Sequence, residues 1–431
     1  MLVTLTACSK PAAVPERPAD IAPLPTAPTA PATSEAAPSE PPPLLASDLL
    51  AMRLDEAQLD DGWVRLFDGW TFFGWQQVGN ANWTIANQTI RADQGDAGFL
   101  ATILPWTDFE LQVEFLAAEE TNSGVFLRTP LAPEDPAVDC YELNIAPASN
   151  PFPTGSLVKR QGIEPLSMEG FDTSQWHTYL VRCEGDQISI HLDGDFLYTY
   201  RDEAPIRSGH LALQFNQGPI EFRNILVRPL GWVPLIPAER TAAGTLTGWQ
   251  SPADMERFFQ WNEEGFLQVR GGSGYLESAG SYGDFAVRCT ARTNGQNQNS
   301  GIFFRCLPGE AMNGYEAQIS NDMQDRNPFL PANCGSGGFF RRQDARIIAA
   351  ENDQWFRMLV VARGSEMAAW VDGLQVSQWR DDRAADPNPR RGQRLEPGTL
   401  MIQGHDPETA VDIRQLDVIP LDSRSLQPGA E

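Results

Sequence analysis

Apolar and polar residues alternate with a period of two along most of the chain. The alternation is regular over residues 109–115 and again over 188–192. Because successive side chains of a β-strand point to opposite faces, this pattern predicts strands with one buried face. Asp-Gly pairs at 193–194 and 372–373, each between such runs, are typical of tight hairpins. Many short strands separated by Gly, Asn, Asp and Pro predict an all-β protein built from sandwiches.

The N-terminal part of the chain lacks this alternation. Residues 9–47 are dominated by Pro and Ala and contain almost no aromatic or β-branched side chains. A segment of that composition cannot form a core, so we expect a disordered linker. The only helix that the pattern favours is a short one over residues 48–60, directly before the first strands.

Residues 5–8, Leu-Thr-Ala-Cys, resemble a bacterial lipobox, in which small residues precede a Cys that is lipidated. We therefore expect residues 1–8 to be the remnant of a lipoprotein signal and Cys8 to carry the lipid, with the true start of translation upstream. The alternative is a chance match. The expected location is the bacterial cell envelope, on the periplasmic or outer-membrane face. No later stretch offers the roughly 18 apolar residues of a spanning helix, so membrane attachment would rest on the lipid alone.

The same order of short motifs occurs twice between residues 61 and 421, which decides the domain organisation. This repeat predicts a first domain over 61–231, a second over 235–421 and a tail over 422–431. The matching positions are Asn122-Ser123-Gly124 with Asn299-Ser300-Gly301, Arg128 with Arg305, Tyr141-Glu142 with Tyr315-Glu316, Trp176 with Trp355, Asp193-Gly194 with Asp372-Gly373, Gln214 with Gln403, and Arg223 with Arg414.

Charge and cysteine content narrow the classes of partner. The 431-residue chain has a formal net charge of −25, which disfavours nucleic acid because binding phosphates requires a basic surface. Five cysteines follow Cys8, and their spacing indicates neither a zinc site nor a redox pair. We expect them mainly to pack in the core, and a bridge between two of them stays open. They are Cys140, Cys183, Cys289, Cys306 and Cys334.

Both copies are similar to the 3-keto-disaccharide hydrolase family. Copy one carries the resemblance in Leu66-Phe67-Asp68-Gly69, in the repeated motifs and in Phe222-Arg223-Asn224, and copy two carries it in residues 314–319 and 402–405. The resemblance implies a concanavalin A-like jelly roll in each copy and an activity on 3-keto glycosides. The copies also depart from the family pattern. Copy one has Phe215-Asn216 where the family commonly has a His, and copy two ends in Ile413-Arg414-Gln415.

Cleavage of a 3-keto glycoside needs a base near C2, donors at the ketone oxygen and a proton source at C1. On residues 315–319 the alternation places Glu316 and Gln318 on one face, and on 399–405 it places Gln403 beside His405. If the two strands share a sheet, these side chains converge. We expect His405 or Glu316 to be the base and Arg305 to stabilise the enolate, with copy two as the likelier catalytic domain.

Other matching positions suggest contact with sugar rather than catalysis. The predicted substrate-binding residues are Gln318, Gln403, Asn299, Arg128, Glu142 and Gln214. The competing interpretation is that a polar strand face is solvated and that Arg and Glu on neighbouring strands form structural ion pairs. No cofactor is expected. Asp322, Asp325 and Asp406 could hold a divalent cation, but their spacing does not indicate a metal site, and none is assigned.

The sequence is therefore compatible with three classes of function. The leading interpretation is a hydrolase or lyase of 3-keto glycosides with a carbohydrate substrate. The alternative is a glycan-binding protein without catalysis, for which the same fold suffices. The third is a structural surface protein without a ligand. A base and its partners on one strand face in copy two favour the enzyme, and the loss of the His in copy one favours binding there.

Overall fold

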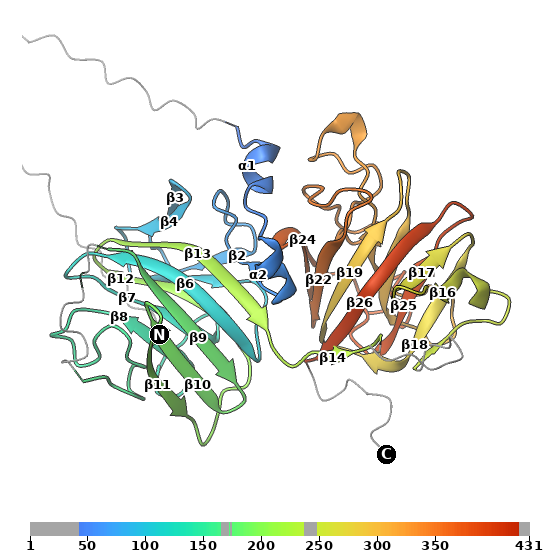
Figure 1. Ribbon diagram of the computed structural model, residues 1–431. Helices are drawn as coiled ribbons and strands as arrows, with labels where there is room; N and C mark the ends of the chain where they lie inside the picture. The colour runs from blue at the N-terminus through green and yellow to red at the C-terminus, as the bar shows by residue number, and fades with distance from the viewer. Residues whose placement is uncertain (1–42, 165–171, 173–174, 237–247, 422–431) are drawn as a thin grey trace, which may run out of the picture. The chain divides into compact units, whose positions relative to one another are not determined.

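The computed structural model describes residues 43–164, 172, 175–236 and 248–421. The described residues from Leu44 onward belong to one compact unit. Two β-sandwiches make up most of this unit, each with a larger and a smaller antiparallel sheet (Figure 1). The all-β prediction of two tandem sandwiches is confirmed. Cys8 and most of the predicted linker lie outside the described residues.

The first sandwich pairs an eight-stranded sheet, in the order β11-β10-β9-β6-β13-β4-β3 with β1 beside β13, with a five-stranded sheet, in the order β2-β5-β12-β7-β8. Its strands are β1 Val64–Arg65, β2 Trp75–Val78, β3 Thr84–Ala86, β4 Thr89–Ala92, β5 Gly98–Thr102, β6 Phe109–Ala117, β7 Asn122–Thr129, β8 Tyr141–Ile145, β9 His177–Glu184, β10 Gln187–Leu192, β11 Asp195–Arg201, β12 His210–Gln217 and β13 Ile220–Pro229.

The second sandwich repeats this arrangement, with one sheet in the order β16-β17-β26-β19-β22-β23-β24 and β14 beside β26, and the other in the order β15-β18-β25-β20-β21. Its elements are β14 Val233–Pro234, β15 Trp249–Gln250, η2 Glu256–Phe258, β16 Phe259–Trp261, β17 Leu267–Arg270, β18 Gly274–Tyr282, β19 Phe285–Thr293, β20 Ser300–Cys306, β21 Tyr315–Ile319, η3 Gln324–Arg326, β22 Phe356–Arg363, β23 Glu366–Val371, β24 Leu374–Arg380, β25 Gly398–Gly404 and β26 Ala410–Pro420.

The period-two pattern in the sequence corresponds to the two faces of these sheets. Along β6 buried and half-buried side chains alternate without interruption, as predicted for residues 109–115. In β21 the side chains of Tyr315, Ala317 and Ile319 join the core of the second sandwich. The side chains between them, Glu316 and Gln318, therefore lie on the face of the smaller sheet turned away from that core. We call this face, in either sandwich, the open face.

Both predicted Asp-Gly hairpins are present and have left-handed backbone at both turn positions. Asp193 and Gly194 have φ of 52° and 87°, and Asp372 and Gly373 have φ of 45° and 78°. Two consecutive positive φ angles match the turn whose twist suits a right-twisted hairpin. They connect β10 to β11 and β23 to β24, which fixes the register of both larger sheets.

The single helix expected over residues 48–60 is instead two short helices, α1 Ala46–Leu50 and α2 Glu56–Asp60. Asp55 starts the second one, because its side chain accepts a hydrogen bond from the backbone of Gln58 and the Gln58 side chain bonds back. Between the helices, the Leu54 backbone N–H donates to Asp372 O at 3.3 Å. A contact with the second sandwich thus replaces the helical bond that a continuous helix would need.

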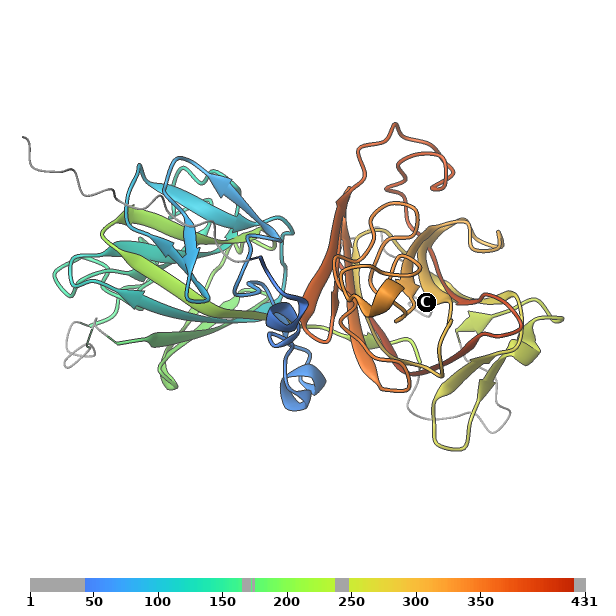
Figure 2. The ribbon, with the colours of Figure 1, turned by 90° about the horizontal axis from the view of Figure 1, so that it is seen from above.

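The cysteines and the long loops complete the description. Five cysteines are buried and form no disulfide, in line with a packing role. Two long loop segments of the second sandwich, between β21 and β22 and between β24 and β25, are drawn in orange and red-orange in Figure 2. In the described ranges of the chain we find no helix with the length and apolar character needed to cross a membrane.

Candidate functional site

A cavity of about 320 Å³ opens on the smaller sheet of the second sandwich. Its volume is at the lower end of the range for small-molecule sites, which starts near 300 Å³. The wall combines strands β20, β21 and β25 with the two long loops. The lining residues are Phe303, Met312, Gly314, Tyr315, Glu316, Phe339, Phe340, Arg341, Arg342, Pro389, Arg390 and Gln403. We call this the Glu316 cavity.

Glu316 is a buried carboxylic acid in this wall, with an exposed fraction of only 9%. Gly301 on the neighbouring strand β20, which pairs with Gln318, leaves space for the Glu316 side chain, because an added Cβ there would lie 2.8 Å from Glu316 Oε1. The amide of Gln318, oriented to satisfy both of its polar atoms, donates to Glu316 Oε1 at 3.1 Å and to Ser300 O at 2.7 Å. The repeated Asn-Ser-Gly motif therefore makes room for the carboxyl group.

Burial raises the pKa of Glu316 to about 7, although the guanidinium groups of Arg390 and Arg341 act in the opposite direction. Loss of water disfavours the charged form of a carboxyl group, and nearby cations favour it. The acid is consequently divided between both protonation states near neutral pH. That is the property a general acid or base requires.

Gln403 contributes an acceptor to the same cavity. It lies on β25 with an exposed fraction of 7%, and its Oε1 is buried without a hydrogen-bond partner among the described residues. Its backbone is held by Ser300, whose hydroxyl donates to Gln403 O at 2.7 Å. A buried acceptor without a partner costs free energy, which a bound hydroxyl donor would recover.

Three arginines give the cavity its positive charge. Arg342 donates to Arg390 O at 3.0 Å, and Arg390 donates to Met312 O. Arg341 lies with its guanidinium carbon 5.3 Å from the Phe340 ring centroid. Within the described part of the chain, no ion pair joins any of these three guanidinium groups to a carboxylate. The cavity is thus cationic in a strongly acidic chain.

The first sandwich places a matching acid on its own open face. Glu142 is 7% exposed, and burial raises its pKa to about 7, against a hydrogen bond from Gln214 and the charge of Lys159. Gln214 Oε1 is also buried without a partner. The cations differ, because Lys159 Nζ is paired with Asp135 at 2.9 Å and the neighbouring Arg160 with Asp202 at 2.9 Å.

The prediction that Arg305 faces the same site as Glu316 is wrong. Its side chain is fully buried, with an exposed fraction of 0%. It donates to Gly283 O at 2.8 Å, to Gly364 O at 2.8 Å and to Asp284 Oδ1 at 3.2 Å. Such a side chain ties loops together and cannot reach a substrate in the cavity.

Arg128, predicted to contact sugar, has the same structural role in the first sandwich. It donates to Thr107 O at 2.7 Å, to Ile206 O at 2.8 Å and to Asp108 Oδ1 at 2.8 Å. Arg128 and Arg305 share a φ of 50°, a left-handed conformation that turns the side chain out of the strand alternation. The recurrence of an arginine at this place in both copies therefore reflects a structural role and not a contact with substrate.

His405 and Asn299 do not line the Glu316 cavity. The His405 side chain is 42% exposed, and its Nδ1 lies 2.8 Å from Asp406 Oδ2. Among the acidic residues considered for a cation, Asp322 accepts bonds from Asn297 N and from Asn352 Nδ2. Across the described ranges no three His, Cys, Asp or Glu side chains are grouped as a metal site would require.

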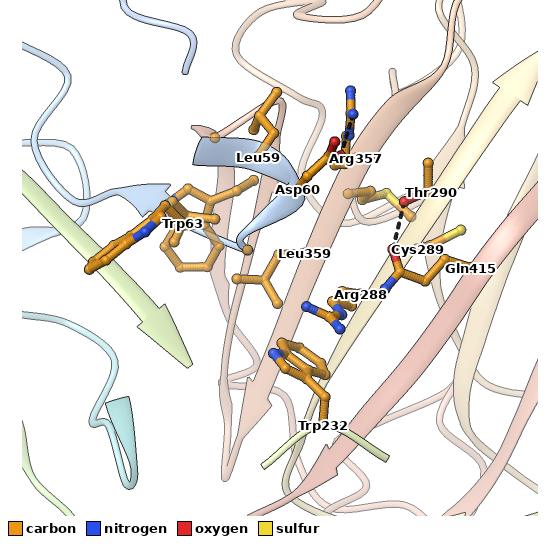
Figure 3. Close-up of a pocket in the computed structure, with 15 residues that line it drawn as sticks. Leu59, Asp60, Trp63, Trp232, Arg288, Cys289, Thr290, Arg357, Leu359 and Gln415 are labelled. Carbon is orange, nitrogen blue, oxygen red and sulfur yellow. Dashed lines mark hydrogen bonds and ion pairs between the residues drawn. The ribbon is translucent and has the colours of Figure 1, made fainter. Parts of the chain in front are cut away.

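A second pocket is lined by Trp63, Trp232 and Trp370 (Figure 3). Arg288 stacks on the Trp232 ring, with 4.6 Å between the guanidinium carbon and the ring centroid. Gln415 accepts a bond from Thr290 at 3.0 Å. The pocket measures only about 30 Å³, about a tenth of the smallest volumes usual for small-molecule sites, so we do not regard it as the substrate site.

Sequence reasoning missed the arginines of the cavity. A signal was present, because Lys159-Arg160-Gln161 recurs as Arg341-Arg342-Gln343. In both copies the first basic residue has positive φ, 59° at Lys159 and 60° at Arg341. Arg390 has no counterpart, since it lies in residues 381–397, where the first sandwich has the shorter segment 202–209.

Several known proteins are similar to parts of this chain. A 3-keto-disaccharide hydrolase of Bacteroides thetaiotaomicron is 34% identical over 91 residues, which cover 18% of this chain and 31% of that protein. A proposed glycosyl hydrolase of Parabacteroides distasonis is 16% identical, with 42% of this chain and 99% of that one covered and a TM-score of 0.38.

A Bacillus licheniformis β-glucanase is 14% identical, with 39% of this chain and 97% of that one covered and a TM-score of 0.31. The match to a family model is far more extensive than these likenesses. The model for the 3-keto-alpha-glucoside-1,2-lyase-like domain matches residues 62–228 and again residues 231–419. This chain therefore belongs to that carbohydrate-active family, with two tandem copies of its domain.

Proposed function

We propose that the second sandwich cleaves 3-keto glycosides at the Glu316 cavity, with Glu316 as the base. The observation that carries this proposal is a buried carboxyl group whose pKa lies near 7, in a cavity that also holds cations and an acceptor without a partner. The family match supports the substrate class. The fold by itself does not, because one fold supports many functions.

The proposed reaction is an elimination followed by hydration. The Glu316 carboxylate takes the proton from C2, and the C–H electron pair forms an enolate whose negative charge lies on the C3 oxygen. The enolate then collapses to a C1–C2 double bond, the C1–O bond breaks, and the departing oxygen takes a proton. Water adds its hydroxyl to C1 and its proton to C2, which releases the free 3-keto sugar. No covalent enzyme intermediate forms.

The cavity supplies what these steps need. Arg341 and Arg390 influence the charge of Glu316, so a cation lies within electrostatic reach of the carbanion that Glu316 would generate. Gln403 Oε1 would accept a sugar hydroxyl and orient the ring. His405 stays a candidate for the proton donor only through movement of its loop, so Glu316 replaces it as the leading base.

For the first sandwich we propose glycan binding. Gln214 Oε1 supplies an acceptor on the open face, as Gln403 does in the second sandwich. The cations of this sandwich near the open face, Lys159 and Arg160, are however paired with Asp135 and Asp202. A site without available positive charge can hold a sugar but cannot stabilise an enolate well.

The test compares Glu316→Gln with Glu142→Gln in the full chain, beside His405→Ala. We expect Glu316→Gln to lower kcat on a 4-nitrophenyl 3-keto-glucoside by roughly 10²- to 10⁴-fold, the usual contribution of a general base. Glu142→Gln should change kcat less than about threefold. In D₂O, wild type should exchange the C2 proton of free 3-keto-glucose, and Glu316→Gln should not.

Two results would refute the proposal. Absence of turnover of either anomer of the 3-keto-glucoside by wild type would leave glycan binding as the function. Loss of turnover in Glu142→Gln but not in Glu316→Gln would move the active site to the first sandwich.

We further propose export and lipid attachment at Cys8. The support is the sequence Leu5-Thr6-Ala7-Cys8 followed by a long segment rich in Pro and Ala. Expression in a bacterium with the upstream coding sequence, fed with an alkyne-labelled fatty acid, should label wild type and not Cys8→Ser. An equal signal from both proteins would exclude attachment at Cys8.

A further inference from the structure

The basic side chains near the two open faces form different ion pairs. The contrast is clearest at one aspartate that occupies the same place in both sandwiches. In the first sandwich Asp202 binds the hydroxyl of Tyr141 at 2.7 Å and the guanidinium of Arg160 at 2.9 Å. In the second sandwich Asp381 likewise binds the hydroxyl of Tyr315 at 2.7 Å. Its guanidinium partner, however, is Arg383, at 2.8 Å.

Arg383 belongs to the longer segment 381–397 and takes the position at this aspartate that Arg160 has in the first sandwich. Arg342, which occupies the place of Arg160, forms no ion pair with Asp381 among the described residues, although the charge of Asp381 still acts on it, and it lines the Glu316 cavity. The same segment brings Arg390 to the cavity wall. Arg341 takes the place of Lys159, but among the described residues no aspartate pairs with it as Asp135 pairs with Lys159.

The outcome is an excess of positive charge over what the proposed reaction uses. One negative charge develops on the enolate, and Glu316 supplies at most one more. Arg341, Arg342 and Arg390 together carry three positive charges, since guanidinium groups stay protonated in proteins. Like charges gathered around one cavity repel each other, and a bound anion relieves this repulsion.

We propose that the glycoside bound in the Glu316 cavity carries an anionic group, a carboxylate or a sulfate, which Arg341, Arg342 and Arg390 recognise. Planar guanidinium groups bind such oxyanions with paired N–H donors. The substrate class is then an acidic 3-keto glycoside, in which the sugar or its aglycone bears the charge. This inference rests on the proposed function for the reaction, but the anion site itself does not depend on turnover.

The experiment compares three 4-nitrophenyl 3-keto glycosides, each as both anomers: the neutral glucoside, the glucuronide and the glucoside 6-sulfate. Wild type should show a kcat/KM for at least one acidic substrate that is roughly tenfold or more above that for the neutral one. In Arg390→Gln and Arg341→Gln this ratio should fall severalfold, and in the double variant it should approach one. The matched control is Arg391→Gln, because Arg391 lies in the same insertion but pairs with Asp386 outside the cavity.

A binding measurement separates failure of this inference from failure of the proposed function. Titration of wild type with D-glucuronate, D-glucose 6-sulfate and D-glucose should show binding that favours an acid and weakens in the double variant. Turnover of the neutral substrate without any acidic preference would overturn the inference and leave the proposed function intact. If wild type binds an acidic sugar through these arginines but turns over none of the substrates, the anion site is supported and the proposed function is refuted. A preference that persists in the double variant would also overturn the inference.

Discussion

The open faces of the two sandwiches share the contacts that position a glutamine and a buried glutamate, and they differ in the charged side chains around that glutamate. In both sandwiches a serine hydroxyl holds the strand of the site glutamine, from Ser123 to Gln214 O at 2.6 Å and from Ser300 to Gln403 O at 2.7 Å. In both, a glycine leaves space for a buried glutamate. In the part of the chain that the structure describes, the cavity of Glu316 in the second sandwich is lined by three arginines that form no ion pair with a carboxylate, whereas the cations near Glu142 are paired.

The comparison distinguishes residues that maintain the fold from residues that give the cavity its charge. Most residues that recur between the copies hold loops or stack on the larger sheet. Arg223 lies 3.9 Å from the ring centroid of Trp176, and Arg414 lies 4.9 Å from that of Trp355. The charge of the Glu316 cavity comes instead from Arg341 and Arg342, in the loop between β21 and β22, and from Arg390, in residues 381–397. The features that distinguish the second copy from the first therefore lie in its loops.

The largest expected effect is a loss of stability when the buried arginine that both sandwiches share is replaced. Arg305→Met and Arg128→Met should each lower the free energy of unfolding by about 3–5 kcal/mol, because each removes the guanidinium group that donates to several carbonyl groups and pairs with an aspartate. Arg305 should cost more, since its partner Asp284 is less exposed than Asp108, the partner of Arg128. Urea denaturation measures both.

The control for these variants is Arg223→Met, whose partly exposed pair with Glu114 should contribute no more than about 1 kcal/mol. Losses of that small size for Arg128→Met and Arg305→Met would show that the two buried arginines are not structural. They would then return as candidates for substrate contact.

The second prediction concerns the cost of burying the two glutamates. Burial raises the pKa of Glu142 and Glu316 from 4.5 to about 7, so the folded protein binds these protons more tightly than the unfolded chain. Each group thus favours folding below pH 4.5, and this contribution is lost as pH rises through 7. At pH 8, Glu142→Gln and Glu316→Gln should each raise the free energy of unfolding by about 2 kcal/mol.

At pH 5 the same variants should differ little from wild type, because both glutamates are then mostly protonated in the folded protein. Measured by urea denaturation at the two pH values, equal effects at pH 5 and pH 8 would contradict the raised pKa. Turnover measured on the same two variants distinguishes the two copies further. Glu142→Gln should gain stability without loss of turnover, whereas Glu316→Gln should gain stability and lose turnover.

The sequence predicted the fold well because strand alternation and repeated motifs are local signals. The hairpins at 193–194 and 372–373 and the outward parity of Glu316 followed from a period of two. The helix over 48–60 was wrong because the backbone of Leu54 bonds to Asp372, a contact far away in sequence.

The site was only partly predictable for the same reason. Glu316 and Gln403 lie on regular strands, so parity placed both correctly on the cavity wall. Arg305 leaves the alternation through its positive φ, which the residue type does not signal. Arg390 reaches the cavity from an insertion without regular structure, and no periodicity describes such a segment.

The third prediction tests the space that the glycines provide. Gly301→Ala would place Cβ 2.8 Å from Glu316 Oε1, so the carboxyl group must move, and kcat should fall roughly tenfold, equivalent to about 1.4 kcal/mol. In Gly124→Ala the nearest atom of Glu142 is Cγ, at 3.3 Å, which needs a smaller shift. Turnover of that variant should stay unchanged. An equal loss in both would mean that the two sandwiches act together.

The smallest effect concerns the electrostatic control of the base. Arg390 and Arg341 both lower the pKa of Glu316, and the contribution of Arg390 is the larger one. The rise of kcat/KM with pH reports the pKa of the base in the free enzyme, so its midpoint should lie near 7. Arg390→Gln should move this midpoint upward by less than about one unit, Arg341→Gln should move it less, and Arg391→Gln should not move it. A downward shift in Arg390→Gln would contradict Glu316 as the base, because removal of a cation can only make a carboxylate harder to form.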